Sequence, residues 1–456
     1  MAQSPNIPTL LLCSILLFSC VKEEEMTRIE EGLPTEIVLT LSTTAKPVTR
    51  ADANAIEGET RFLTADVFFF EEATGIQVNH HRLDASEFST AQTGNGYDSY
   101  TYTSTSKIPA TTGKRKMIVG VNLSQELSEK LDGEPIATFT TVPYTVDLSN
   151  PLGIIELTGK ANFNNLSSFP ALYDPRFVMF SVAPMAITIV KDPDFGAKEN
   201  SPVVQVQRMV AKVSVEKAQM MDTISDCWIS NFVWSVKQVN TKTFWVQPAD
   251  KKDPNWATAP MGDLAIAPIT TESKTMNEYD TPFSQFKFAY IPENTTKDYL
   301  RGQLTYIEVK ATIAPKQFKA FINPNDVNVG YQDIINPPYT VSRDFYVVTY
   351  NNGTSRAYFI GESVAKAFAA DYGVDLNTIE YYKGECIWPI FLNPNNNYNV
   401  LRNEYYRCRI TKIVGIGRPP NEDLLDPHLP PVASNDIMVD VDVLDWDSLF
   451  FNSILE

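Results

Sequence analysis

The amino-acid sequence predicts a mainly β protein built from antiparallel sheets. Aromatic residues are plentiful among the 456 residues, with 25 Phe, 20 Tyr and 6 Trp, and such residues favour strands. β-Branched residues recur in short runs, while no long stretch carries the 3.6-residue period of a helix. The length suits two domains after an N-terminal leader. We therefore expect two β domains, at residues 51–220 and 221–456, with a few short helices.

Strands are expected wherever apolar and β-branched residues alternate or cluster between turn-forming residues. In chain order they cover residues 62–70, 76–78, 114–121, 177–181, 186–190, 203–217, 229–236, 243–246, 286–291, 304–313, 386–392, 405–414 and 436–445. The segment 203–217 is partly apolar on both faces, which is typical of a strand packed between two layers. Residues 89–105 are predicted to form a loop or a mobile hairpin. Helices are expected at 125–131, capped by Ser124, and at 363–372, capped by Ser363 and stopped by Gly373.

The first fifty residues read as a leader and a detachable segment. Residues 10–18 are almost wholly apolar but are too short to span a bilayer, as expected of the central region of a signal peptide. The small Ser19 followed by Cys20 fits a bacterial lipoprotein signal, so Cys20 is the expected lipidation site and residues 1–20 the signal peptide. Residues 1–9 lack the usual Lys or Arg. The alternative is a buried N-terminal helix with an incidental cysteine.

Residues 21–50 are predicted to be a propeptide that carries one removable strand. An acidic tether is followed by Ile37, Leu39 and Leu41, which alternate along one face as in a half-buried strand. The polar, proline-broken stretch that ends at Arg50 is expected to be exposed and open to proteolysis, which places the processing site between Arg50 and Ala51.

Charge and cysteine usage limit the possible partners. The net charge is -17, and such a balance disfavours nucleic acid and anionic membrane surfaces, which need clustered Lys and Arg. Cys227, Cys386 and Cys408 remain beyond the leader. Three buried thiols are favoured over a bridge between Cys386 and Cys408, which neighbouring strands would also allow.

The sequence offers no pattern for catalysis or for a resident metal or cofactor. His80 and His81 are adjacent, so in a strand they point to opposite faces and cannot share one ion. Gly415-Ile416-Gly417 lacks the third glycine and the helix of a phosphate-binding loop. Asp440, Asp442 and Asp445 alternate along a strand and are poorly spaced for calcium. We therefore predict that the protein is not an enzyme and has no cofactor.

The C-terminal segment 436–456 is built to lie along another sheet. No basic residue follows Arg418, and Ile437, Val439, Val441 and Val443 alternate with acidic residues. These four apolar side chains are the candidate donor strand, with the terminal stretch 448–455 as the other possibility. The spacing of Ile37, Leu39 and Leu41 is the same, so the two segments could compete for one groove.

Short motifs along nearly the whole chain resemble the Bacteroidales fimbrillins, most closely the major subunit of their short fimbriae. The resemblance rests on the order of the motifs: the Cys20 lipobox, the Arg50-Ala51 junction, and the segments 67–70, 209–213, 232–236, 290–295, 305–307, 384–388, 402–406 and 415–419, followed by a closing Val-Asp-Val strand that ends at Trp446.

The resemblance implies a two-domain β-sandwich with transthyretin-like sheets that reaches the outer membrane as a lipoprotein through lipid on Cys20. It implies cleavage after Arg50 by an arginine-specific protease, and insertion of a strand from the next subunit into the vacated groove. The implied partners are further copies, anchor and tip proteins of a fimbrium at the cell surface, and host or bacterial receptors in adhesion. The alternatives are an accessory or tip subunit, or a non-polymerising surface lipoprotein that binds glycan or protein ligands.

Overall fold

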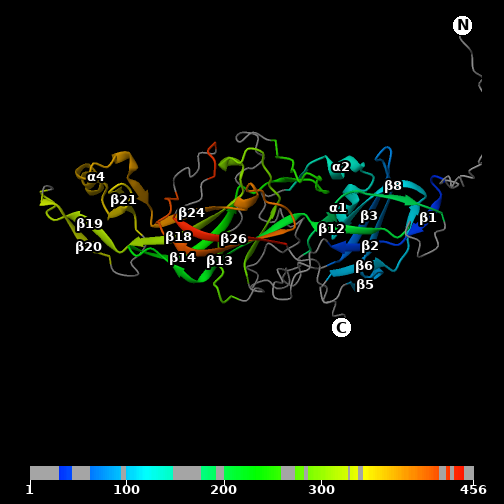
Figure 1. Ribbon diagram of the computed structural model, residues 1–456, viewed down its shortest axis with the longest axis horizontal. Helices are drawn as coiled ribbons and strands as arrows, with labels where there is room; N and C mark the ends of the chain where they lie inside the picture. Colours follow the sequence, from blue (N-terminus) through cyan, green and yellow to red (C-terminus); the bar gives the residue numbers. More distant parts are fainter. Residues whose placement is uncertain are drawn as a thin grey trace, which may run out of the picture.

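Strands joined by a few short helices make up most of the described chain, which confirms the mainly β prediction. The computed structural model describes residues 30–43, 62–93, 99–146, 176–191, 200–257, 273–281, 286–326, 329–336, 343–420, 428–431 and 436–445. The molecule is elongated (Figure 1): strands β1 to β8 lie toward one end, and the β19, β20 and α4 region lies at the other.

A nine-stranded sheet forms the N-terminal part, in the order β4-β3-β8-β10-β12-β2-β6-β5, with β11 also paired to β8. Its strands are β2 (Thr40–Thr43), β3 (Thr64–Glu71), β4 (Gln77–Asp84), β5 (Phe88–Thr93), β6 (Ser99–Ser104), β8 (Gly113–Val121), β10 (Met179–Ser181), β11 (Met185–Ile189) and β12 (Val203–Arg208). Beside it, β1 (Pro34–Ile37) pairs with β7 (Ile108–Thr111). Strands far apart in this order contribute to one apolar cluster, so the sheet curls around a shared core.

Helices α1 (Gln125–Leu131) and α2 (Ile136–Thr140) pack on the N-terminal core, which we define as the buried cluster around Phe68, Val119 and Phe180. Helix α1 begins as predicted, because the Ser124 side chain accepts a hydrogen bond from the Leu127 amide at 3.1 Å. Residues 89–105 form the hairpin β5–β6 around the undescribed residues 94–98.

Two four-stranded sheets enclose the C-terminal core, which we define as the buried cluster around Val213, Trp234 and Tyr406. One sheet has the order β17-β13-β25-β26 and the other the order β16-β14-β18-β24. The strands are β13 (Val210–Asp222), β14 (Cys227–Lys237), β16 (Lys274–Thr275), β17 (Phe288–Pro292), β18 (Tyr306–Pro315), β24 (Glu385–Phe391), β25 (Glu404–Ile413) and β26 (Ile437–Asp445).

A smaller unit closes the far end of the molecule. Here α4 (Glu362–Asp371) covers a three-stranded sheet of β21 (Phe345–Tyr350), β22 (Ser355–Phe359) and β23 (Glu380–Tyr382), beside the hairpin of β19 (Gln317–Phe321) and β20 (Tyr331–Ile335). The remaining pair is β9 (Tyr144–Thr145) with β15 (Lys242–Thr243). Helix α4 begins one residue earlier than predicted, with Gly361 rather than Ser363 at its N-cap.

The predicted strand 203–217 is divided between two sheets. Strand β12 ends at Arg208 in the N-terminal sheet, and β13 begins at Val210 in a C-terminal sheet. Both faces of the first half of β13 are buried, which explains why neither face is fully polar. Val213 and Val215 lie in the C-terminal core, while Lys212 on the opposite face is buried, with its ammonium 3.8 Å from the centre of the Phe288 ring.

Candidate functional site

Residues 30–43 lie inside the N-terminal part as two short strands, of which β2 is central and paired on both sides. Strand β1 pairs antiparallel with β7, and β2 pairs antiparallel with β6 and parallel with β12. We call the position that they occupy the N-terminal slot; its walls are residues 99–112 on one side and 200–206 on the other.

Backbone hydrogen bonds fix residues 38–40 to both walls of the N-terminal slot. The Val38 amide donates to the Asn200 carbonyl and the Thr40 amide to the Pro202 carbonyl, both at 2.9 Å. On the other wall, the Ser104 amide donates to the Leu39 carbonyl at 2.8 Å, and the Leu39 amide donates to the Ser104 hydroxyl at 3.0 Å. Loss of this segment would leave polar backbone groups of both walls without their partners.

The buried side chain of Asn200 ties one wall to the segment. Its amide group donates to the carbonyls of Glu36 at 2.9 Å and Val190 at 3.0 Å, and its oxygen accepts from the Val190 amide at 3.1 Å. The Thr35 hydroxyl also donates to the Val190 carbonyl, at 3.0 Å. Asn200 therefore recognises a strand backbone in the N-terminal slot rather than a particular side chain.

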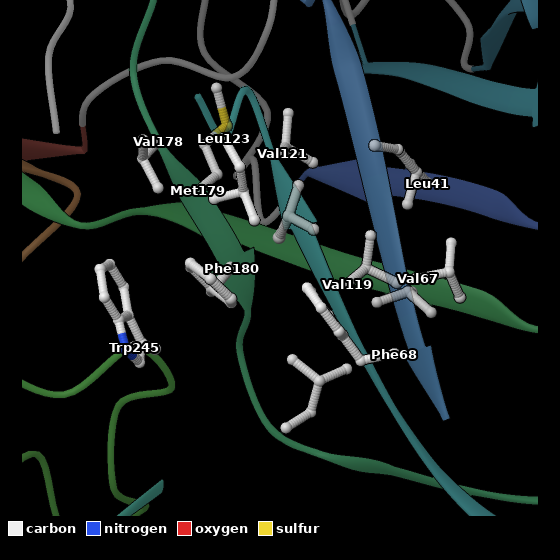
Figure 2. Packing of buried hydrophobic residues seen from close by; sticks show 14 of the residues in the cluster. Leu41, Val67, Phe68, Val119, Val121, Leu123, Val178, Met179, Phe180 and Trp245 are labelled. Atoms are coloured by element: carbon white, nitrogen blue, oxygen red, sulfur yellow. The ribbon is translucent and has the colours of Figure 1, made fainter. Parts of the chain in front are cut away.

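The apolar side chains of the segment fill the N-terminal core. Ile37 and Leu39 are 0% exposed and Leu41 is 2% exposed. Figure 2 shows Leu41 in the cluster that also holds Val67 and Val119. Burial of each such side chain contributes about 1.5–3 kcal/mol. The expected alternation is confirmed: these three residues share the buried face, while the residues between them are partly exposed, as in a half-buried strand.

The outer face of the slot is polar. The Glu36 carboxylate lies 3.2 Å from the Lys107 ammonium, and both side chains are about half exposed. The hydroxyls of Thr40 and Thr103 are 3.0 Å apart. At the start of the segment, Glu31 forms an ion pair with the buried Arg115 at 3.0 Å. The contacts of Glu36 and Thr40 lie on the side of the segment away from the N-terminal core, because these residues alternate with the buried Ile37, Leu39 and Leu41.

Strand β26 stands at the edge of its sheet and pairs with β25 alone among the described residues. Ile437 is buried in the C-terminal core, with Val439 and Val441 partly buried against it. Val443 is 41% exposed, while Leu444 packs against the N-terminal core. Three of the four predicted donor residues therefore line the C-terminal core of their own chain.

The outward face of β26 carries acidic residues opposite two arginines. In the register, Asp440 lies opposite Arg409 and Asp442 opposite Arg407. Both arginines also form ion pairs with the buried Glu216 of β13, at 3.0 and 2.8 Å. A row of alternating charge thus crosses three strands. It favours the position of β26 beside β25 of its own chain, which we call the closed position.

A close backbone contact fixes the beginning of β26. The amides of Val414 and Gly415 donate to the Asp436 carbonyl at 2.8 and 3.0 Å. A Cβ atom on Gly415 would lie 1.7 Å from the Asp436 carboxylate, so any larger residue here would force the Asp436 side chain to move. Burial raises the pKa of the Asp436 carboxyl, and the positive charges of Arg356 and Arg418 oppose this shift.

The three described cysteines are free and buried, as favoured by the sequence. Cys386 and Cys408 lie on strands of different sheets, β24 and β25, and form no bridge. Burial raises the pKa of the Cys227 thiol to about 12 and moves those of the other two in the same direction. All three thiols are therefore poor nucleophiles at neutral pH.

His80 serves packing and hydrogen bonding. Its ring stacks on Phe68 with 4.4 Å between centroids, and Nε2 lies 3.0 Å from the buried Asp66 carboxylate. The Ser128 hydroxyl donates to the same carboxylate at 2.6 Å, which joins α1 to β3. In the described ranges, no three His, Cys, Asp or Glu side chains are arranged to hold a metal ion.

Another buried polar network joins loops near the junction of the two cores. The Arg402 guanidinium donates to the Glu293 carboxylate at 2.9 Å and to the Trp245 carbonyl at 3.1 Å. Burial raises the pKa of the nearby Asp253 carboxyl to about 7, against hydrogen bonds from Thr295 that lower it. The partners on all sides are protein groups, so this network orders the loops.

The predicted site residues are only partly visible. Cys20, Arg50 and Ala51 lie outside the described residues, as do the terminal residues 446–456. The slot residues Asn200, Ser104 and Lys107 were missed by sequence reasoning, because isolated polar residues carry no periodic signal. Within the described ranges, no helix combines the length and the apolar character needed to cross a membrane.

Comparisons with known proteins find similar solved structures. No family model and no curated protein matches the chain. A candidate cell adhesion protein from Parabacteroides distasonis is 14% identical, covering 92% of this chain and 99% of its own, with a TM-score of 0.48. A fimbrilin from Porphyromonas gingivalis is 12% identical, with 91% and 99% coverage and a TM-score of 0.46. The tip fimbrial protein from the same organism, truncated at its C-terminus, is 13% identical, with 90% and 100% coverage and a TM-score of 0.39.

Proposed function

We propose that the chain is a structural subunit of a fimbrium shaft that polymerises by strand insertion and supports cell adhesion. The precursor is exported to the outer membrane as a lipoprotein lipidated on Cys20, and an arginine-specific protease cuts it after Arg50. The observation that carries the proposal is the position of residues 38–43: they lie upstream of Arg50, contain the central strand β2, and are bonded to both walls of the N-terminal slot.

Removal of this strand would leave the N-terminal slot unstable unless another strand took its place. Both walls would lose backbone partners, and the pockets of Ile37, Leu39 and Leu41 would open to water. Among the described strands, the hairpin β5–β6 is joined to the rest of its sheet through β2 alone. A strand with alternating apolar side chains from another molecule restores all three kinds of contact.

The C-terminal segment is the proposed donor, with Ile437, Val439, Val441 and Val443 as the inserted side chains. Among the described residues strand β26 is paired with β25 alone, so its release breaks one ladder and leaves the rest of the sheet paired. A donor and an acceptor on different surfaces of one chain make a head-to-tail contact, which produces a fibre when the rotation does not close a ring.

The division into domains at 51–220 and 221–456 also remains a prediction within this proposal. Separate core clusters support two domains, but the change of core falls between Val210 and Ala211, ahead of the predicted boundary at 220, because β13 belongs to a C-terminal sheet. The acceptor slot then belongs to the first domain and the donor strand to the second, so each contact joins the first domain of one subunit to the second domain of its neighbour.

The test is cleavage of the full chain by an arginine-specific protease. We expect Ala51 as the new N-terminal residue and a ladder of denaturant-resistant oligomers on a gel. Arg50→Ala should keep the chain monomeric, while the matched variant Lys46→Ala should assemble like the unmodified chain. Cut wild-type chain that stays monomeric, or an Arg50→Ala variant that assembles, would contradict the proposal.

A further inference from the structure

We propose that the outer rim of the N-terminal slot recognises the acidic residues of the incoming strand and so sets its direction and register. The inference rests on the proposed function and specifies how donor and acceptor fit. The recognising side chains are those of Lys107, Thr103 and Thr101 on one wall and of Gln205 on the other. The residues that they contact in the incoming strand are Asp436, Asp440 and Asp442.

The segment in the slot and the start of the donor carry one pattern of residue types. Residues 36–42 read Glu-Ile-Val-Leu-Thr-Leu-Ser, and residues 436–442 read Asp-Ile-Met-Val-Asp-Val-Asp. Both begin with an acidic residue followed by three apolar residues, the first of which is isoleucine. In both, a polar, an apolar and a polar residue then follow. Laid in the same direction, the donor places Ile437, Val439 and Val441 in the pockets of Ile37, Leu39 and Leu41.

The acidic residues of the donor then meet the polar groups of the rim. Asp436 takes the place of Glu36, whose carboxylate lies 3.2 Å from the Lys107 ammonium. Asp440 takes the place of Thr40, the direct partner of Thr103, whose hydroxyl can donate to a carboxylate.

The third acid lies between two hydrogen-bond donors. Asp442 takes the place of Ser42, which pairs with Thr101 on β6 and with Gln205 on β12. The side chains of Thr101 and Gln205 belong to the outward-facing positions of their strands. A hydroxyl and an amide therefore flank this carboxylate in the proposed register.

Apolar contacts alone would leave the register ambiguous. Val439, Val441 and Val443 have identical side chains, and a shift of the inserted strand by two residues keeps every side chain on the same face. The slipped strand, however, places Met438 beside Lys107 and Leu444 between Thr101 and Gln205. A strand inserted in the reverse direction, with Val443 in the Ile37 pocket, places Leu444 beside Lys107 and Met438 at Thr101. Both alternatives keep an aspartate opposite Thr103, so discrimination rests on Lys107 and on the pair Thr101 and Gln205, which would each meet an apolar side chain.

The same acids have partners before exchange. In the closed chain Asp440 and Asp442 lie opposite Arg409 and Arg407. Insertion therefore replaces contacts within a chain by contacts between chains, and the acidic residues stay at the surface in both states. Their role is to select the register rather than to drive assembly.

Disulfide trapping between two full-length variants tests the register. One variant carries Thr101→Cys as the acceptor; the other carries Asp442→Cys, Met438→Cys or Leu444→Cys as the donor. The mixture is cut after Arg50 and oxidised mildly. We expect a covalent dimer with Asp442→Cys, because position 442 takes the place of the Ser42 partner of Thr101.

Each other outcome overturns the inference in a recognisable way. Trapping with Leu444→Cys means a two-residue slip, and trapping with Met438→Cys means the reverse direction. Polymers without any trapped dimer mean that another segment, such as 448–455, is the donor. In the first two cases the proposed function stands, and in the third polymerisation by strand insertion stands with different donor residues. If the cut wild-type chain forms no polymer, both proposals fail.

A charge exchange tests Lys107 directly. Lys107→Glu should slow assembly roughly twofold to fivefold, because an exposed attraction becomes a repulsion. Adding Asp436→Lys to the same chain should restore the rate. The matched control Lys383→Glu makes the same change of net charge at an exposed position far along the sequence and should leave the rate unchanged. A double variant no faster than Lys107→Glu would remove Lys107 from the proposal.

Discussion

The two segments that share the acid-isoleucine pattern are held in opposite ways. In the segment 30–43, strand β2 has hydrogen-bonded neighbours on both sides, and the side chains of Ile37, Leu39 and Leu41 are fully buried. Strand β26 has one neighbour, and Val439 and Val441 are only partly buried. The first segment contains a central strand of its sheet, whereas the second is an edge strand.

This difference explains why the proposed assembly would require a cut. A strand at the centre of a sheet is replaced only when its ladders on both sides break, and cleavage after Arg50 would separate it from the chain that follows. A strand at an edge has a far lower barrier to release. An open edge also invites pairing with another chain, which is usually a hazard and would here serve assembly.

The largest expected effect comes from locking β26 in place. Val441 lies opposite Cys408, and both side chains face the C-terminal core, so Val441→Cys can form a disulfide across the two strands. We expect the oxidised variant to lose polymerisation entirely after cleavage and to regain it on reduction.

The control for the lock is Val439→Cys, which faces Ile410 and has no thiol opposite it. It should assemble under both redox conditions. Polymerisation of the oxidised Val441→Cys variant would show that β26 stays closed during assembly and would move the donor role to residues 448–455.

The next effect compares burial in the two segments. Leu39→Ala should lower the free energy of unfolding of the uncut chain by about 2–5 kcal/mol, because it leaves a cavity in the N-terminal core. Val439→Ala should cost about 1 kcal/mol, because that side chain is only partly buried. Urea unfolding measures both. Equal losses would contradict the contrast between a central and an edge strand.

A smaller loss is expected from the tie at the slot wall. Asn200→Ala removes the donor to the Glu36 carbonyl and should lower the free energy of unfolding by about 1–3 kcal/mol. Gln205→Ala, an exposed amide on the same wall, should change it by less than about 0.5 kcal/mol. If the two variants unfold alike, Asn200 has no special part in holding the segment.

The smallest effect concerns pH at the start of β26. The pKa of Asp436 is raised in the folded chain, so its protonated form favours the closed strand. This contribution is fully present below the ordinary carboxyl pKa and is lost as the pH rises through the raised value. Hydrogen-exchange protection of the Val414 and Gly415 amides should therefore fall as the pH rises. Asp436→Asn should flatten this dependence; an unchanged profile in that variant would assign it to another group.

Local patterns predicted the elements whose environment is local or simple. Ser124 and the residues after it specify helix α1, and the alternation at residues 436–445 specifies a strand, because caps and period-two patterns act within a few residues. The break at Met209 escaped prediction, since residues 203–217 keep a strand pattern across a change of sheet. Residue type alone also favoured Ser363 over Gly361 as the cap of α4.

The sequence by itself determined that Ile37, Leu39 and Leu41 share one face and that residues 436–445 form a strand with acidic residues on the other. Only the tertiary structure decided that the first group lies at the centre of a sheet and the second at an edge. It also brought Asn200, Ser104 and Lys107 to the first segment. The reason is physical: alternation encodes which side of a strand is buried, but the strands that flank it are chosen by distant parts of the chain.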